Sequence, residues 1–401
     1  MYTGDNAIIS RFYEYKFSEY RIIFIIHKSC LCLFKSSVEN LHRRAAHRKF
    51  LKYIEHFAAS ASPMKIKVIN IWENPTAIYL YSRKLASVDN RNISVLDMYQ
   101  QIPGSNRIKR EMQMGLDSYF QGLFLRYKLK SDGYDILHYT DPMIPPVKTH
   151  KTSVVTVHDN PAILLNSDLY FSNTFNNRLT KKFLKRNIDR YIDFKNILTN
   201  SNYVRKSLLE YGFTGNIETI HLSIDPYFKK LQERDKIRNE LGLPDSKTLL
   251  LSVSTNVKRK NLNIIEKAMK LLPDNFALVR VGESIGKSIT FQNVSKEKLN
   301  KIYNACDVLL MSSIEEGLGL PLIEGFATGI PVVASDIEVF HEIGKDAVEY
   351  IDPMNVQPLI DGINTAVQNR DKMIYRGDKI VPEFSFEIFK DKMLNYYKKI
   401  L

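Results

Sequence analysis

The sequence predicts an α/β protein in which two doubly wound domains, each built on a parallel sheet, face a central cleft. From Met64 onward, short apolar runs alternate with longer amphipathic ones, which is the pattern of parallel strands joined by helices. A polar stretch with two prolines, residues 223–247, separates two series of this alternation, so a domain boundary is expected there. With 401 residues, 44% of them hydrophobic, the chain has enough apolar material for two buried cores.

Residues 1–63 stand apart from this alternation. They carry ten Lys or Arg against five Asp or Glu, and we expect them to form a basic extension outside the folded core. The longest apolar window, YRIIFIIHKSCLCLF at 20–34, is interrupted by His27 and Lys28. It falls short of the roughly 20 apolar residues that a membrane-spanning helix needs. The small residues at 58–62 lie too far beyond it for a signal-peptide cleavage site.

The first series contains six candidate strands, each a short apolar run that fits a strand buried in a sheet. Amphipathic stretches lie between most of them. One of these, NYVRKSLLEYGF, has Gly212 near its end as a helix stop signal. The candidate strands lie at 65–72, 92–99, 135–139, 153–159, 196–201 and 216–222.

The second series follows residues 223–247, which predict a linker and a short helix. EIFKDKMLNYYKKIL, beyond Pro382, predicts a strongly amphipathic helix at the end of the chain. The other predicted helices lie at 259–272, 295–306 and 321–328. The candidate strands lie at 248–254, 276–282, 307–311, 331–336 and 347–352.

The amino-acid composition limits the kinds of molecule that the protein is expected to bind. The net charge of +13 indicates attraction to something negative, either phosphorylated small molecules, an anionic lipid surface or nucleic acid. Nucleic acid is not expected, because the chain lacks the mixed aromatic and basic clusters of single-strand binders. A solvated Lys-rich surface and peripheral contact with anionic lipid both remain open. The three cysteines, Cys30, Cys32 and Cys306, have no metal-type spacing and indicate a reducing compartment.

One turn in the second series contains residues that could bind a ligand. In SSIEEGLGLPLIEGFATGIPVVASD, a buried strand ends, the chain turns at two glycines, and Pro321 starts a helix. Free amides at that helix start would attract a phosphate, and Gly317 and Gly319 would let a ligand approach the backbone. Glu324, one turn further, suits a ribose diol. A ligand-free strand-to-helix connection explains the same residues, so local chemistry leaves both readings open. The dinucleotide fingerprint G-x-G-x-x-G is absent from the sequence.

The wider stretch resembles the signature of the family 4 retaining glycosyltransferases. EEGLGLPLIEGFATGIPVVASD, followed by FHEIGKDAVEYIDP, carries two glutamates that flank seven residues, as in that family, and these are Glu316 and Glu324. The similarity covers nearly all of 248–395, including SVSTNVKRKNL. In the first half it is readable in DILHYTDP, VVTVHDNPAIL, ILTNSNYVRKSLLEYG and IHLSIDPYF.

The resemblance implies a GT-B fold with two Rossmann-like domains. Residues 64–228 would bind the acceptor and residues 229–383 the nucleotide-sugar donor, and the helix at 384–401 would cross back to the first domain. It implies retaining transfer of a hexose, of mannose or glucose type, to a glycan, lipid-linked or other hydroxyl acceptor. It implies neither a cofactor nor a metal, because fixed cations would do the work of Mg²⁺. The expected location is cytoplasmic, with peripheral contact at the inner face of the membrane left open.

The resemblance also implies roles for individual residues. Arg259 and Lys260 match the basic pair that holds the donor diphosphate, and Glu316 matches the glutamate that faces the donor sugar. His158 matches a cleft histidine near that sugar. The catalytic set is then His158, Glu316 and Lys260, and the donor-binding set is Thr255, Arg259, Lys260, Gly317, Leu318, Gly319, Leu320 and Glu324.

Two departures from the family bear on the site. Ser254 stands where the family usually has a glycine, and the first strand-to-helix loop, NIWENPTAI, contains no glycine. Two alternatives to transfer remain at this point. One is a non-hydride sugar-nucleotide epimerase of the same architecture, and the other is a non-catalytic basic binding protein.

Overall fold

The computed structural model describes residues 64–70, 77–97, 133–140, 151–161 and 194–401, the single residues 129, 185, 188 and 189, and two strands near the N-terminus. The chain divides into two compact units, Met1–Pro63 and Met64–Leu401. In the first unit, β1 (Arg11–Phe17) and β2 (Tyr20–Ile26) pair antiparallel. Strand β2 takes up the first part of the apolar window 20–34. The rest of that window and most of the loop NIWENPTAI lie outside the described residues.

The first sheet of the larger unit is parallel and has six strands in the order β4-β3-β5-β6-β7-β8. Each of the six strands lies on an apolar run that predicted it. Helix α8 (Asn202–Tyr211) begins at Ser201, whose side chain accepts from the Val204 amide, and ends at Gly212 with φ 104°. The strands are β3 (Ile66–Asn70), β4 (Ile93–Asp97), β5 (Ile136–Tyr139), β6 (Thr152–Val157), β7 (Asn196–Thr199) and β8 (Asn216–Thr219), and α3 (Ala77–Val88) follows β3.

The second sheet is also parallel, with six strands in the order β11-β10-β9-β12-β13-β14. The sequence pattern missed β11, which has only three residues and none fully buried. Chain order reverses between the neighbours β9 and β12, which makes this the switch point of the sheet. The strands are β9 (Thr248–Val253), β10 (Phe276–Val281), β11 (Ile289–Phe291), β12 (Val308–Met311), β13 (Val332–Ser335) and β14 (Val348–Ile351).

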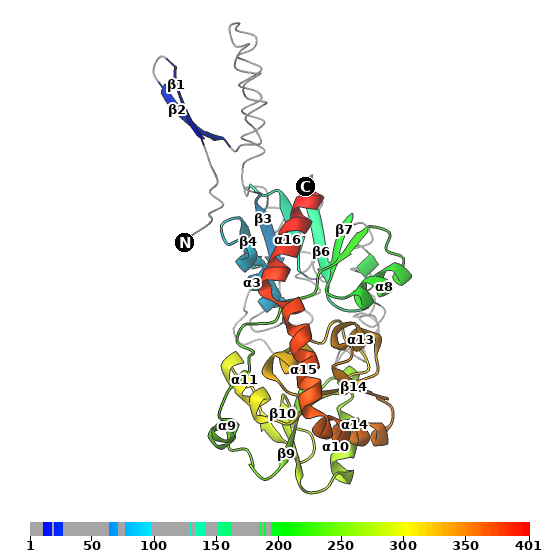
Figure 1. The fold of residues 1–401 in the computed structure, drawn as a ribbon. Helices are drawn as coiled ribbons and strands as arrows, with labels where there is room; N and C mark the ends of the chain where they lie inside the picture. Colours follow the sequence, from blue (N-terminus) through cyan, green and yellow to red (C-terminus); the bar gives the residue numbers. More distant parts are fainter. Residues whose placement is uncertain are drawn as a thin grey trace, which may run out of the picture. The chain divides into compact units, whose positions relative to one another are not determined.

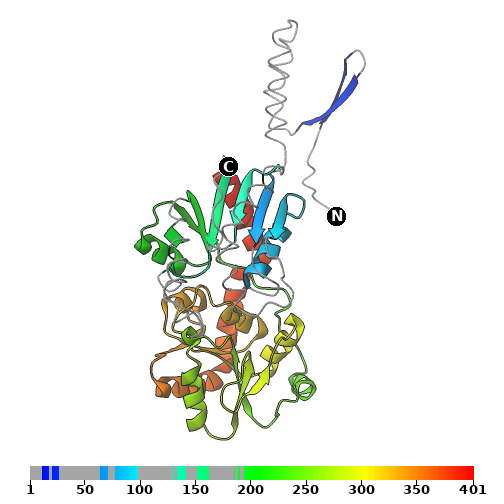
Figure 2. The ribbon, with the colours of Figure 1, turned by 180° about the vertical axis from the view of Figure 1, so that it is seen from behind.

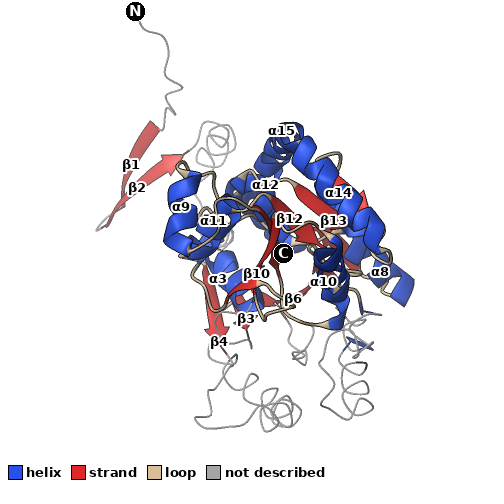
Figure 3. Cartoon of the chain, turned by 90° about the horizontal axis from the view of Figure 1, so that it is seen from below, coloured by secondary structure: helices blue, strands red, loops and turns tan. Residues whose placement is uncertain are grey.

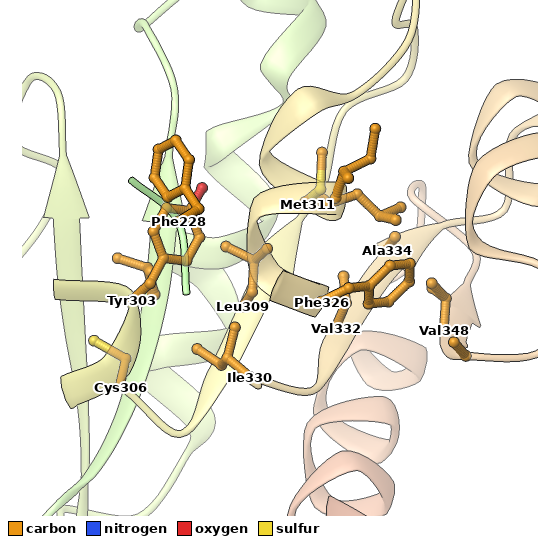
Figure 4. Close-up of a cluster of buried hydrophobic side chains, with 14 of the residues drawn as sticks. Phe228, Tyr303, Cys306, Leu309, Met311, Phe326, Ile330, Val332, Ala334 and Val348 are labelled. Carbon is orange, nitrogen blue, oxygen red and sulfur yellow. The ribbon is translucent and has the colours of Figure 1, made fainter. Parts of the chain in front are cut away.

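Helices cover both faces of the second sheet because successive strand residues point to opposite sides. Leu249 and Leu251 pack in one core with residues of α11 and α12, whereas Leu250 packs in another with residues of α10 and α14. Figure 3 shows the helices around this sheet, and Figure 4 shows Tyr303 of α11 and Phe326 of α12 in the first of these cores. The helices of this half are α9 (Arg234–Leu241), η2 (Lys258–Lys260), α10 (Leu262–Leu271), α11 (Lys296–Ala305), α12 (Leu320–Thr328), α13 (Glu338–Gly344), α14 (Val356–Gln368), α15 (Arg370–Ile380) and η3 (Val381–Phe384).

The last helix, α16 (Phe386–Ile400), returns to the first sheet (Figures 1 and 2). Its buried face supplies Phe389, Met393, Tyr396 and Tyr397 to a core that also contains Ile66 of β3. The expected architecture, two doubly wound halves with a final helix that crosses back, is therefore confirmed. Within the described part of the chain, none of the helices has the length and apolar character needed to span a membrane.

Candidate functional site

A polar pocket lies at the switch point of the second sheet. The carboxyl ends of β9 and β12 form its floor, which is where ligands bind in open α/β sheets. Its polar lining comes from the end of β9 and from the loops after these two strands. The polar side chains are Ser252, Ser254, Lys260, Ser312, Ser313 and Glu316.

Glu316 lies between the two predicted donor-binding cations. Its Oε2 accepts a hydrogen bond from Arg259 Nη1 at 2.7 Å, and its Oε1 pairs with Lys260 Nζ. Ser313 Oγ donates to the same Oε1 at 2.7 Å. Glu316 is 8% exposed, and each of its carboxylate oxygens accepts at least one hydrogen bond from a protein group. The structure thus brings three residues of the predicted site into one buried ion cluster.

The charge state of Glu316 follows from this cluster. Burial alone would raise the pKa of its carboxyl group, but the adjacent Lys260 and Arg259 more than offset burial and lower the pKa to about 2. Glu316 is therefore ionised at neutral pH. A buried charge of this kind is tolerated only because it is paired and hydrogen-bonded.

The turn after β12 is held against the first half of the unit. Ser201 Oγ donates to the Gly317 carbonyl at 2.6 Å, and Tyr203 Oη donates to Glu315 Oε1 at 2.6 Å. A Cβ atom on Gly317 would overlap the carbonyl oxygen of His158. Gly317 is therefore required for the close approach of the two halves, and this approach places the Glu316 turn next to the predicted cleft histidine.

His158 follows β6 and has a defined tautomer. Its Nε2 lies 3.0 Å from the Thr140 carbonyl, which can only accept, so Nε2 carries the proton and Nδ1 the lone pair. The ring of Tyr81 packs edge-on against it at 4.8 Å between centroids. Burial lowers the pKa of His158, and the nearby Asp159 offsets this only in part. The imidazole is therefore neutral at physiological pH.

Glu324 lies on α12, on the side away from the strands. Its Oε2 accepts a hydrogen bond from Tyr303 Oη at 2.7 Å. Burial raises the pKa of Glu324 to about 7, and the hydrogen bond from Tyr303 counters this effect only partly. A fraction of this carboxyl group is therefore protonated at neutral pH.

The helix start differs in one respect from the expectation of free amides over 320–323. The Leu322 amide donates to the Gly319 carbonyl at 2.9 Å, and Pro321 has no N–H, so fewer donors are available there than expected. Gly319 has φ 89°, and a Cβ at this position would overlap the Phe340 ring. The Leu318 side chain is buried in the core, and Leu320 is partly exposed.

Thr255, the remaining residue of the predicted donor-binding set, is exposed on the loop after β9. Among the described residues, no group of three or more His, Cys, Asp or Glu side chains is arranged to hold a metal ion.

Two residues near the site were missed by sequence reasoning. Glu342 of α13 accepts from the amides of Asn202 and Tyr203 at 2.8 and 3.0 Å, and so caps helix α8 of the other half. His221 Nε2 lies 2.7 Å from the same carboxylate. Arg280, in β10, is fully buried beside the pocket. A charged residue inside the apolar run FALVRVG was the available signal for Arg280, whereas Glu342 has no local signal.

Two family profiles match the chain. The profile described as "Glycosyltransferase Family 4" matches residues 100–228, and the one described as "Glycosyl transferases group 1" matches residues 233–379. Together they cover more than two thirds of the chain. The O-antigen chain mannosyltransferase RfbU of Salmonella typhimurium is a relative, 25% identical over 276 residues, with 65% of this chain and 71% of the relative covered.

Solved structures of low sequence identity share the fold. Sucrose-phosphate synthase from Thermosynechococcus elongatus aligns with a TM-score of 0.71 and 16% identity, over 84% of this chain and 99% of that one. HepE from Anabaena, in complex with UDP-glucose, aligns with a TM-score of 0.63 and 14% identity, over 84% of this chain and 100% of that one. The family matches favour glycosyl transfer over the epimerase and basic-binding-protein alternatives.

The contact between Gly317 and His158 generates a stability prediction. Gly317→Ala forces a methyl group into the His158 carbonyl, and we expect it to lower the free energy of unfolding by about 1–3 kcal/mol, the usual cost of overpacking. Gly133→Ala is the matched control, because its added methyl group meets no atom of the described residues within 4 Å, and it should change stability by less than about 0.5 kcal/mol. Urea denaturation measures both. Equal stability of the two variants would contradict the close approach of the halves.

Proposed function

Because the chain belongs to the family 4 glycosyltransferases, we propose that it transfers a hexose from a nucleotide-diphosphate sugar to a hydroxyl group of a glycan or lipid-linked acceptor. The observation that carries this proposal is the polar pocket at the switch point of the second sheet, which is lined by Lys260 and Glu316, with Arg259 paired to the same carboxylate. A mannose or glucose donor is supported by the names of the relatives, an O-antigen mannosyltransferase and a protein solved with UDP-glucose. Residues 229–383 would bind the donor and residues 64–228 the acceptor.

Donor binding in this proposal is an exchange of ion pairs. Glu316 neutralises Arg259 and Lys260. A diphosphate brings negative charge to the same two cations, and charge-assisted hydrogen bonds to them would replace those of Glu316. The released carboxylate would then accept hydrogen bonds from hydroxyls of the donor sugar. Each of these two partly buried cations would thus keep an anionic partner throughout donor binding.

The other predicted site residues would contact the ribose, the phosphates and the sugar of a donor bound at this pocket. Glu324 would accept hydrogen bonds from the ribose hydroxyls, which would favour its ionised form. Thr255 and the backbone of residues 317–320 would line the phosphates and the sugar. Neutral His158 would accept a hydrogen bond from a sugar hydroxyl at Nδ1. No cofactor is part of the proposal.

The proposed reaction retains the anomeric configuration and uses no metal. The bond between the anomeric carbon and the diphosphate oxygen breaks, and the acceptor oxygen bonds to that carbon on the same face. The acceptor proton passes to the departing diphosphate. Arg259 and Lys260 would stabilise the charge that develops on the leaving group, so catalysis rests on positioning and fixed electrostatics.

Ligand-induced stabilisation tests the donor class. We expect one nucleoside diphosphate and its sugar to raise the melting temperature well above all others, because a ligand at 100 times its Kd adds about 2.7 kcal/mol of stability. With that donor and an acceptor, NMR should show a product of unchanged anomeric configuration, formed equally well in EDTA. The absence of any nucleotide-dependent shift would overturn the proposed function. An inverted product or loss of activity in EDTA would overturn the mechanism alone.

The ion cluster predicts which substitutions abolish transfer. Lys260→Ala and Glu316→Ala should each lower turnover at least ~10²-fold, the scale of losing one preorganised electrostatic contact. Lys258→Ala is the matched control, because Lys258 lies in the same short helix η2 but is exposed, and its turnover should equal that of the wild type. Initial rates at saturating donor decide the outcome. Near-normal transfer by either site variant would remove that residue from the mechanism.

Peripheral contact with the inner face of a membrane is part of the proposal, because the net charge of +13 suits an anionic surface and a lipid-linked acceptor. The full chain should co-sediment with phosphatidylglycerol vesicles at low salt and be released at high salt. Phosphatidylcholine vesicles, which carry no net charge, are the control. Failure to bind anionic vesicles at low salt would contradict membrane contact and leave the transferase assignment in place.

A further inference from the structure

Arg280 is a buried cation whose hydrogen bonds to the described residues go to neutral groups, although the charge of Glu283 partly offsets the effect of burial on its pKa. It is 0% exposed, at the carboxyl-terminal end of β10, and is among the largest fully buried side chains of the described residues. Among those residues, no carboxylate forms an ion pair with it. Its hydrogen bonds go to neutral acceptors on three residues, Ser252, Ser254 and Glu283. Placing a guanidinium there is costly unless an anion compensates for it.

The surrounding chain holds the guanidinium tightly. Nη1 donates to the Ser252 carbonyl at 3.1 Å, and Nη2 donates to the Ser254 carbonyl at 2.9 Å. Gly282 has φ 137°, and a Cβ there would overlap the Ser254 carbonyl and touch Nη2. Burial lowers the pKa of Arg280 to about 10, so the group remains charged at neutral pH.

The serine hydroxyls connect Arg280 to the pocket. Nη1 also donates to Ser252 Oγ at 2.9 Å and to Ser254 Oγ at 3.1 Å. Each hydroxyl oxygen therefore uses a lone pair on Arg280, and its own proton must be directed elsewhere. Both serines line the pocket, and no described residue accepts from either hydroxyl. The two O–H groups are thus available as donors to an anion in the pocket.

Arg238 shows what a purely structural buried arginine looks like in the same half. It is 6% exposed, and its Nη2 pairs with Asp307 Oδ2 at 2.7 Å. That ion pair is complete without a ligand and lies away from the pocket lining. Arg280 differs in lacking a carboxylate and in contacting two pocket serines.

We propose that Arg280 is a positioning residue of the donor site, which orients the Ser252 and Ser254 hydroxyls toward the donor diphosphate and supplies a counter-charge behind them. The inference rests on the proposed function, because the anion it requires is the diphosphate of the donor. It also gives Ser254, which replaces the glycine usual in the family, a direct part in binding.

Binding of nucleotides with and without phosphate tests the assignment. The probes are UDP and GDP, compared with uridine and guanosine, measured by calorimetry or by competition. Arg280→Met should weaken binding of the preferred diphosphate at least about tenfold, the effect of losing a charge-assisted interaction, and leave binding of its nucleoside unchanged. Arg280→Lys keeps the charge but not the forked geometry of the guanidinium. Its affinity for the diphosphate should therefore lie between those of the wild type and Arg280→Met. Arg238→Met is the matched control and should lower stability without changing diphosphate affinity.

The serines provide a second route if Arg280→Met does not fold. Ser252→Ala combined with Ser254→Ala should weaken diphosphate binding several-fold while nucleoside binding is retained. Equal loss of diphosphate and nucleoside affinity in the Arg280 or serine variants, or no loss in either, would overturn the role of Arg280. If the wild-type protein binds neither UDP nor GDP nor any other nucleoside diphosphate, the donor-site function itself fails rather than this inference.

Discussion

The buried pairing of Glu316 with Arg259 and Lys260 is the interaction on which the site depends. It joins the loop after β12 to the short helix η2 after β9, the two segments that meet at the switch point. Backbone contacts reinforce the junction, because the Ile314 amide donates to the Arg259 carbonyl at 2.8 Å and Ser312 Oγ donates to the Lys260 carbonyl at 2.8 Å. Without the carboxylate, the two cations would be left unpaired in a poorly solvated site. The two loops would then lose the ion pairs that hold them together.

The same turn links the two halves of the larger unit. Ser201, Tyr203 and the backbone of His158 contact residues 315–317, and Glu342 caps helix α8 from the opposite half. These contacts are polar and mostly buried, so they specify one arrangement of the halves rather than a sliding interface. The predicted histidine of the first half and the predicted glutamate of the second consequently lie beside one another.

Charge at this site is arranged before any ligand arrives. Arg259 and Lys260 are neutralised by a carboxylate, whereas the hydrogen bonds of Arg280 to the described residues go to neutral acceptors. In the proposed function, a diphosphate would displace one anion and compensate the charge of Arg280. Fixed charges of this kind need little reorganisation during reaction, which is the usual basis of electrostatic catalysis.

The sequence by itself determined the alternation of strands and helices, the restart of that pattern after residue 247, and the glycine-rich turn. Apolar runs and glycines act locally, so each of the eleven predicted strands lies on the run that indicated it. Within the two six-stranded sheets only the three-residue β11, with no buried residue, was not predicted, and the pair β1 and β2 near the N-terminus was not predicted either. The family resemblance singled out Arg259, Lys260 and Glu316. Only the tertiary structure decided that these three neutralise each other, that Gly317 receives the His158 carbonyl, and that Arg280 faces two pocket serines. These pairings join residues that are far apart in the chain. Their energies depend on burial, which a local sequence pattern does not predict.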